Sequence, residues 1–337
     1  MSFSRYLLKR IAFMILVLIG ASILSFVLVR IVPGDPARIL LPPQAKQEDI
    51  DRMKEKMGLD EPYIKQYSQY VKSLLKGDLG FSYHTGRSVV DEFKWRLPAT
   101  IELSMLSLLL AALVGIWLGV ISATNKNGFA DHASRLFSIG GISAPGFWIG
   151  LLCIYVFYYK LSWVPAPTGR VNLIRETATG GSGFLLWDAV ITGNWDLFKD
   201  ALMHLILPVF VLSYSFLAMI CRLTRTGMIE VSQQDYIRFA KSCGIKKKRI
   251  IWKYSLKNGI RPVLTMLGMF LAQLIGGVVF IETVFNWPGI GRYAVDAINF
   301  LDYGPIQGFI IFMALIYVVT NLIVDLIYMV IDPRVQY

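Results

Sequence analysis

The sequence predicts an all-α integral membrane protein with six transmembrane helices. Of its 337 residues, 55% are hydrophobic and only 17% are charged, and the mean hydropathy is +0.53. A soluble domain of this composition would not stay in solution. Six apolar stretches also reach the roughly 20 residues that a helix needs to cross a bilayer. They cover residues 11–31, 100–122, 136–159, 201–221, 264–284 and 309–331.

Basic residues predict the orientation of these spans. Arg5, Lys9 and Arg10 precede the first stretch, and the connection at residues 222–261 is strongly basic, whereas the alternate connections are nearly balanced. Cytoplasmic loops carry such an excess, so both termini are expected in the cytoplasm. The first stretch is too long for a signal peptide, and no cleavage site precedes Pro33. The net charge of +11 fits these loops, and no nucleic-acid-binding module is visible.

The chain divides into two predicted parts. Residues 1–98 would form the first transmembrane helix plus an extracytoplasmic loop that a turn opens at residues 33–36. Within that loop we expect helices at 47–57, ended by Gly58, and at 63–75, ended near Gly77. Residues 99–337 would form a five-helix core that includes the cytoplasmic loop 222–261.

Features inside the spans suggest helix contacts and bends. Gly115 with Gly119, and Gly146 with Gly150, have the GxxxG spacing that lets helix backbones approach closely. Proline interrupts two stretches and is expected to shape packing rather than form a gate. These prolines are Pro145 and Pro208, and the ionisable residues inside the stretches are Glu102, His204, Glu282 and Asp325.

One soluble, helix-patterned segment lies between the fourth and fifth stretches. Ser232 and Asp235 have capping-box spacing, and Gly244 stands where a helix C′ residue belongs, which predicts a helix of about eleven residues. Its helical spacing places four residues on one face: Tyr236, Phe239, Ala240 and Cys243. A second, basic helix is expected from Lys246 onward. The first helix could dock into a groove on a cytoplasmic partner, or lie on lipid headgroups.

This segment resembles the EAA loop of bacterial ABC importer permeases of the dipeptide, oligopeptide and nickel family. The resemblance implies an ATPase-coupling helix carried by Asp235, Tyr236, Arg238, Phe239, Ala240, Cys243 and Gly244, with the loop ending at Asn258 and Pro262. Further motifs of the family follow in order. They are residues 33–36, 58–62, 77–80 and 96–100, an outer signature of Glu282, Trp287, Pro288 and Gly289, then Asp302 with Tyr303, and residues 332–334. The long loop before Ala201 most resembles the dipeptide branch.

The chain departs from the family pattern at a few positions. Pro262 follows Gly244 by 18 residues, a spacing usual in the peptide branch. Cys243 stands where that branch commonly has a basic residue, and Gly304 separates Tyr303 from Pro305. These last two departures concern local contacts only.

The resemblance implies a type I ABC importer permease fold in the bacterial inner membrane. Its partners would be a homologous second permease in a heterodimer, two cytoplasmic ATPases and an extracytoplasmic solute-binding protein. The solute would be a di- or oligopeptide, with nickel chelates, haem and antimicrobial peptides as alternatives.

The chain itself carries no recognisable catalytic chemistry. Its glycine-rich patches lack the lysine of a phosphate-binding loop, and its histidines and cysteines have no metal-ligand spacing. We therefore expect no enzymatic activity, no cofactor and no metal, with ATP hydrolysis in separate subunits. An ion-coupled secondary transporter is the alternative, for which only Asp325 offers a charge at the membrane midplane.

Overall fold

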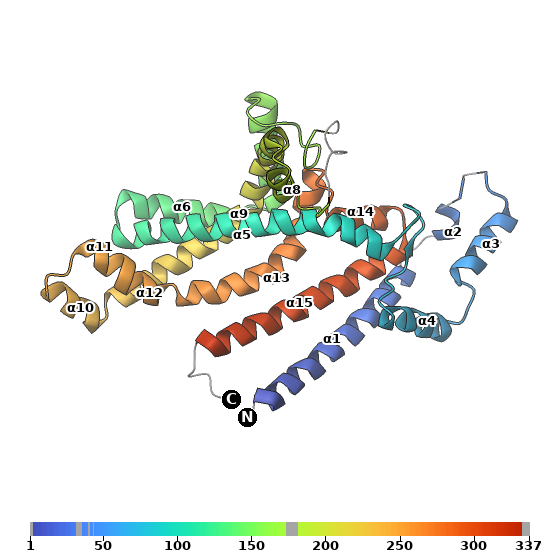
Figure 1. Cartoon of the computed structure of the whole chain (residues 1–337), viewed down its shortest axis with the longest axis horizontal. Helices are drawn as coiled ribbons and strands as arrows, with labels where there is room; N and C mark the ends of the chain where they lie inside the picture. The colour runs from blue at the N-terminus through green and yellow to red at the C-terminus, as the bar shows by residue number, and fades with distance from the viewer. Residues whose placement is uncertain (1–2, 32–35, 40, 43, 173–180, 332–337) are drawn as a thin grey trace.

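The computed structural model describes residues 3–31, 36–39, 41–42, 44–172 and 181–331 (Figure 1). Most of the expected turn at residues 33–36 and the closing motif at residues 332–334 lie outside the described residues. The long helices are α1 Phe3–Ile31, α5 Val89–Thr124, α6 Phe129–Ser143, α9 Trp195–Ser232, α13 Arg261–Val284 and α15 Tyr303–Ile331. The shorter elements are α2 Pro36–Ile39, α3 Gln47–Met57, α4 Tyr63–Leu75, β1 Phe81–Ser82, β2 Arg87–Ser88, α7 Gly146–Cys153, the π-helix η1 Ile154–Lys160, α8 Leu185–Ile191, α10 Asp235–Ser242, α11 Lys247–Arg249, the π-helix η3 Ile250–Ser255, α12 Leu256–Gly259 and α14 Ile290–Asn299.

Within the described residues, four helices are long and apolar enough to cross a membrane, or five if one bent pair is a single span. The four lie at Leu8–Ile31, Val89–Thr124, Trp195–Ser232 and Tyr303–Ile323. The bent pair is Phe129–Gly141 with Gly146–Lys160. The stretch predicted at residues 264–284 is helical, as α13, but is not among these spans. The all-α membrane architecture is therefore confirmed, while the count of six remains a prediction.

The two prolines behave differently. Pro145 lies at the break between α6 and α7, where the paired segments bend by 106°. Its ring removes a backbone donor and disfavours helix for the residue before it, so Ala144 is extended. Pro208, by contrast, lies inside α9, which continues through it.

Helices α5 and α9 pack against each other at the centre of the fold (Figure 1). Gly115 and Gly119 make this contact close. A Cβ on Gly119 would lie 2.5 Å from the Thr224 Cβ, and one on Gly115 would lie 2.9 Å from the Ile220 Cβ. The GxxxG prediction for this stretch is confirmed. For the third stretch it holds only at Gly150, where a Cβ would lie 3.4 Å from Phe285 and 3.7 Å from Val211, whereas a Cβ on Gly146 would meet nothing within 4 Å.

The helical loop that was predicted to be extracytoplasmic is fastened to helix α1. Helix α4 lies against α1, where the hydroxyls of Ser22 and Tyr67 are 2.9 Å apart and those of Ser25 and Tyr70 are 3.0 Å apart. Both predicted loop helices are present with the predicted bounds, and Gly58 ends the first in the left-handed conformation, with φ 65°. Helix α1 also packs against α15 (Figure 1).

Candidate functional site

The predicted cytoplasmic helix is present but shorter than the capping pattern indicated. Helix α9 continues through Ser232, whose Oγ donates to the Ile229 carbonyl oxygen at 2.7 Å, so Ser232 cannot cap α10. Helix α10 begins at Asp235 after Gln234, which makes no side-chain cap. The predicted helix end is confirmed, since Gly244 has φ 71°. The capping-box prediction was wrong because the apolar periodicity of α9 extends its helix into the loop.

Helix α10 has one buried face and one exposed face. Ile237 and Ala240 are buried and pack with Ile250 of η3. Phe239 is 71% exposed and Tyr236 is 43% exposed. The grouping of Ala240 with Tyr236 and Phe239 on a single docking face was therefore wrong. Ile237, absent from that grouping, defines which side of the helix turns inward.

The end of the loop returns to this helix. The side-chain amide of Asn258 donates to the Tyr236 hydroxyl at 2.9 Å and to the Tyr254 carbonyl oxygen at 3.1 Å. Pro262 lies in the first turn of α13, where a backbone N–H has no partner within the helix, so proline costs no helical hydrogen bond there. Asp235 and Arg238 form a solvent-exposed ion pair at 3.5 Å. The structure thus brings the two ends of the EAA-like loop into contact.

Close backbone packing ties this loop to α9. A Cβ on Gly227 would overlap the carbonyl oxygen of Gly259 in α12, so these two glycines allow the helices to touch. Beside this contact is a cavity of about 450 Å³, lined by Thr124, Met228, Ile237, Lys247 and Ile250, among others. The cavity separates α10 and η3 from the end of α5.

The outer signature residues occupy a different, fully packed region. The Thr100 hydroxyl donates to Glu282 Oε1 at 2.6 Å, and the Arg292 N–H donates to Oε2 at 2.9 Å. The Ile290 N–H donates in turn to the Thr100 oxygen at 3.0 Å. Glu282 is completely buried. This carboxylate therefore joins the end of α13 to α5 and to the start of α14.

The rest of the signature completes the same cluster. Trp287, 1% exposed, donates its indole N–H to the Ala99 carbonyl oxygen at 3.0 Å. Gly289 lies against Glu282, and a Cβ there would overlap the carboxylate. Pro288 borders a small pocket beside Arg170. We call Thr100, Glu282, Trp287 and Gly289 the outer latch.

Two further ionisable residues of the predicted spans, Glu102 and His204, also have hydrogen-bond partners. Arg170 donates to Glu102 at 2.6 Å, and the Leu186 N–H donates to the other oxygen at 2.9 Å. His204 Nδ1 lies 2.8 Å from the Asp200 carbonyl oxygen. The side chain of Asp325 lies outside the described residues. Among the described residues, no group of three His, Cys, Asp or Glu side chains could hold a metal ion.

Gly304 also has a local explanation. Asp302 accepts from the Ser82 hydroxyl at 2.6 Å and from the His84 N–H at 3.1 Å, which fixes the β1–β2 turn beside α15. A Cβ on Gly304 would overlap the carbonyl oxygen of Phe81. The residue between Tyr303 and Pro305 therefore has to be small.

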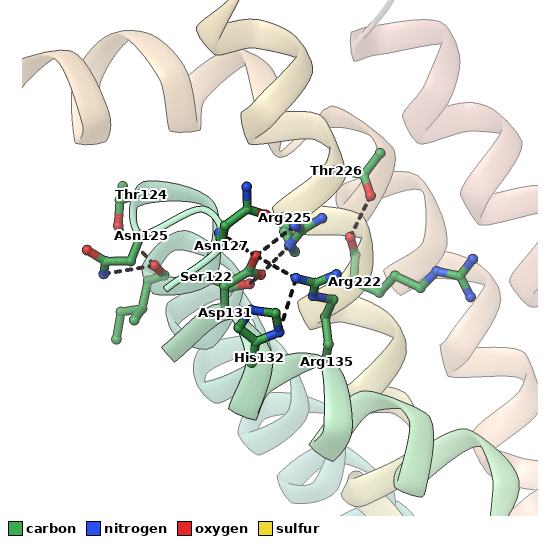
Figure 2. Close-up of polar contacts among 11 residues, drawn as sticks. Ser122, Thr124, Asn125, Asn127, Asp131, His132, Arg135, Arg222, Arg225 and Thr226 are labelled. Carbon is green, nitrogen blue, oxygen red and sulfur yellow. Dashed lines mark hydrogen bonds and ion pairs between the residues drawn. The ribbon is translucent and has the colours of Figure 1, made fainter. Parts of the chain in front are cut away.

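The sequence reasoning missed one cluster, centred on Asp131 (Figure 2). Asp131 is completely buried at the start of α6, and Arg225 of α9 donates to both of its oxygens, at 2.6 and 2.9 Å. Ser122 of α5 donates to the carboxylate at 2.6 Å. In the sequence, Asp131 appears only as a single acidic residue next to a predicted span. Its partner Arg225 lies 94 residues later, so no local pattern connects the two.

Comparisons with known proteins agree with this arrangement. Residues 115–337 match the family described as binding-protein-dependent transport system inner membrane component, and residues 3–104 match its N-terminal companion family. The chain is 40% identical to the dipeptide transport system permease protein of Alkalihalophilus pseudofirmus, over 98% of this chain and 99% of the relative. It is 41% identical to the probable D,D-dipeptide transport system permease protein of Escherichia coli K12, over 99% and 98%. An oligopeptide transport system permease protein of Bacillus subtilis is 35% identical over 98% and 99%.

The apolar helices and these matches define an α-helical permease component of a multi-pass inner-membrane transporter. The chain belongs to the binding-protein-dependent transport system inner membrane component family. It is therefore a permease subunit of an ABC importer, a system in which ATPase and binding-protein partners are implied.

Proposed function

We propose that this chain is the six-span permease subunit of an ATP-driven importer for dipeptides or short peptides. Residues 1–98 form the first span and the outer helical loop, and residues 99–337 form the translocation core. The chain pairs with a homologous second permease, two ATPases and an extracytoplasmic binding protein. This substrate class is supported by relatives that are named as permeases for dipeptides and oligopeptides. Both termini lie in the cytoplasm.

In this proposal α10 is the coupling helix, and its exposed aromatic residues enter a groove of the ATPase. The assignment rests on the exposure of Phe239. Its side chain, on an 8-residue helix in a loop rich in charged residues, is 71% exposed. Burying such a ring in a partner is worth about 2 kcal/mol. Tyr236 and Cys243 extend the same surface, while Asp235 and Arg238 form its polar edge.

The buried side of α10 supports this division of roles. Ala240 and Ile237 rest on Ile250, so they set the angle at which α10 projects from η3. Asn258 holds Tyr236 from the far end of the loop. Gly244 stops the helix and turns the chain into α11. The helix is thereby presented by its own loop, with the aromatic side left for the ATPase.

The decisive test is Phe239→Asp in the assembled importer. A charge in the desolvated groove should weaken ATPase attachment by about 2–5 kcal/mol. The measurement is pull-down of the ATPases with detergent-solubilised permease at equal membrane abundance. Phe239 contributes little to this chain's own packing, so the variant should fold normally. Normal ATPase recovery with Phe239→Asp would refute the coupling assignment.

Two controls sharpen that test. Lys247→Ala removes one of several neighbouring basic residues and should leave attachment unchanged. Ala240→Asp should instead reduce the abundance of the permease itself, because it places a charge among Ile237 and Ile250 inside the chain. If Ala240→Asp and Phe239→Asp had the same effect on permease abundance and on ATPase attachment, the division of α10 into a buried and an exposed face would be contradicted.

Orientation and energy supply have their own tests. Of the three cysteines, Cys243 is exposed, whereas Cys153 and Cys221 are buried. In cells lacking the ATPases, an impermeant thiol reagent should label an introduced Lys76→Cys from outside, and Cys243 only after permeabilisation.

The energy supply is tested by transport. Reconstituted uptake of tritiated dialanine should need ATP and the ATPases and should survive collapse of the proton gradient. Gradient-driven uptake without ATP would favour the secondary transporter.

A further inference from the structure

The cytoplasmic ends of α5, α6 and α9 meet at one buried carboxylate. Asp131 has no exposed surface, and its partner Arg225 keeps only 21% of its side chain exposed. The two Arg225 contacts, at 2.6 Å from Nε and 2.9 Å from Nη2, form a bidentate pair. Such a pair fixes direction as well as distance, because two parallel hydrogen bonds admit only one relative orientation of the groups.

Three further donors bond to the same carboxylate, and two of them come from neighbouring elements. The Ser122 hydroxyl, near the end of α5, donates to Oδ1 at 2.6 Å. The Asn127 N–H donates to Oδ2 at 3.0 Å from the turn between α5 and α6, where Asn127 has φ 63°. Arg135, one turn along α6, donates to Oδ2 at 3.3 Å. Asp131 therefore holds two helix ends and their connecting turn to α9 (Figure 2).

Net stability alone explains such a cluster poorly. A buried ion pair returns little free energy compared with an apolar replacement of similar volume, because both charges must leave water. Such a pair can instead favour one arrangement of the helices that it joins over others. The location of the pair, near the predicted coupling helix, then indicates that the arrangement of α5, α6 and α9 matters for coupling.

Arg225 lies close to the predicted coupling helix. Only about two helical turns separate it from Ser232 at the end of α9. A two-residue link, Gln233 and Gln234, then leads into α10. Any movement of α10 along the α9 axis therefore reaches Arg225 through a continuous helix.

A direct route from α10 to α5 is interrupted. The cavity of about 450 Å³ lies between Thr124 at the end of α5 and Ile237 and Ile250 on the coupling loop. Displacement of α10 toward α5 would first fill this space. Packed side chains, hydrogen-bond and ion-pair networks and rigid helices carry energetic coupling between sites. Here the buried polar contact that joins the coupling end of α9 to both α5 and α6 is Asp131, which lies beside the close α5–α9 contact of Gly119 with Thr224.

We propose that Asp131 is a positioning residue for transport: it clamps α5 and α6 to α9, so that movement of the coupling helix moves three spans as one body. This inference rests on the proposed coupling role of α10. Asp131 has no exposed surface, so its role is exerted through the residues that it holds. Ser122 of α5 and Arg225 of α9 are the arms of the clamp, and Arg225 is the arm that receives the movement.

The test is the number of ATP molecules hydrolysed per solute imported. The assembled importer, with its own ATPases, second permease and binding protein, is reconstituted in proteoliposomes. Phosphate release and uptake of tritiated dialanine are followed together. Asp131→Asn keeps the shape of the side chain but removes the charge that holds Arg225. It should leave ATPase attachment intact and raise the ratio roughly tenfold, within the usual range of coupling factors.

Arg222→Gln is the matched control. Arg222 lies three residues before Arg225 on the same helix, is exposed, and points away from Asp131 in Figure 2. Its loss should leave the ratio at the wild-type value. An unchanged ratio in Asp131→Asn, with uptake and hydrolysis falling in proportion or not at all, would overturn the clamp.

Ser122→Ala decides the matter if Asp131→Asn does not assemble. It removes only the α5 arm and leaves the ion pair in place, so the protein should fold. The ratio should rise about threefold, since a hydrogen bond to a charged group is lost. A wild-type ratio in that variant would refute the proposal. Failure of the coupling assignment would show separately, as normal ATPase recovery with Phe239→Asp.

Discussion

The outer latch and the EAA-like loop at residues 222–261 are built in opposite ways. In the latch, Glu282 and Trp287 are almost completely buried, and each has its hydrogen-bond partner inside the chain. In the loop, Phe239 is mostly exposed and a cavity lies behind α10. Both regions carry family signature residues. The difference shows that the latch residues maintain the architecture of the chain, and it supports our proposal that the exposed residues of the loop bind a second protein.

This contrast changes how substitutions should be interpreted. Damage to the latch should appear as loss of the permease itself, since unpaired or overpacked groups in a core destabilise the fold directly. Damage to the exposed side of the loop should appear only in the assembled complex. Abundance in the membrane and ATPase recovery therefore distinguish the two regions.

The largest effect is expected from Gly289→Ala. Its new Cβ would overlap the Glu282 carboxylate, which Thr100 and Arg292 hold in place. Overpacking at so constrained a site should destabilise the permease by about 3 kcal/mol. Membrane abundance and thermal stability in detergent are the measurements. Gly146→Ala, whose Cβ faces open space, is the control and should behave as wild type.

A smaller effect is expected from Gly227→Ala, at the junction of α9 and the loop. The added Cβ would meet the Gly259 carbonyl oxygen, so α12 must move away from α9. The cost should be about 2 kcal/mol. Differential scanning fluorimetry should record a lower melting temperature, with Gly20→Ala, which meets nothing, as the control. A wild-type melting curve would show that α12 is not fixed against α9.

Gly244→Ala probes the end of the coupling helix itself. At φ 71° a side chain is strained although nothing surrounds it, so about 1 kcal/mol is expected. Permease abundance should stay normal while affinity for the ATPases falls about fivefold. Asn tolerates the left-handed conformation better, so Gly244→Asn should lose less. If Asn and Ala were equally harmful, backbone strain would not be the cause.

The smallest effect is expected from Tyr236→Phe. It removes only the hydroxyl that accepts from Asn258, a bond worth about 1 kcal/mol or less at this exposed site. ATPase affinity, measured by titration, should fall by a few-fold at most. Asn258→Ala should have a similar effect, and the double variant should be no worse than the more affected single one. Strictly additive losses would show that the two residues act separately.

Local patterns in the sequence determined much of this protein. Hydropathy placed the apolar helices, and helix-ending glycines bounded α3 and α10, because Gly58 and Gly244 adopt a conformation that other residues avoid. Ordered motifs predicted the permease family. These features depend on neighbouring residues along the chain, so one sequence was enough to find them.

Only the tertiary structure decided which residues meet. Thr100 and Glu282 are 182 residues apart, and Asp131 and Arg225 are 94 apart. Each pair depends on how two helices are rotated and shifted relative to each other, which composition and periodicity leave open. The same holds for α10, where contact with Ile250 determines that Ala240 is buried while Phe239 remains exposed. Helical spacing identifies neighbours on a helix, but only the packing partner selects the side that is buried.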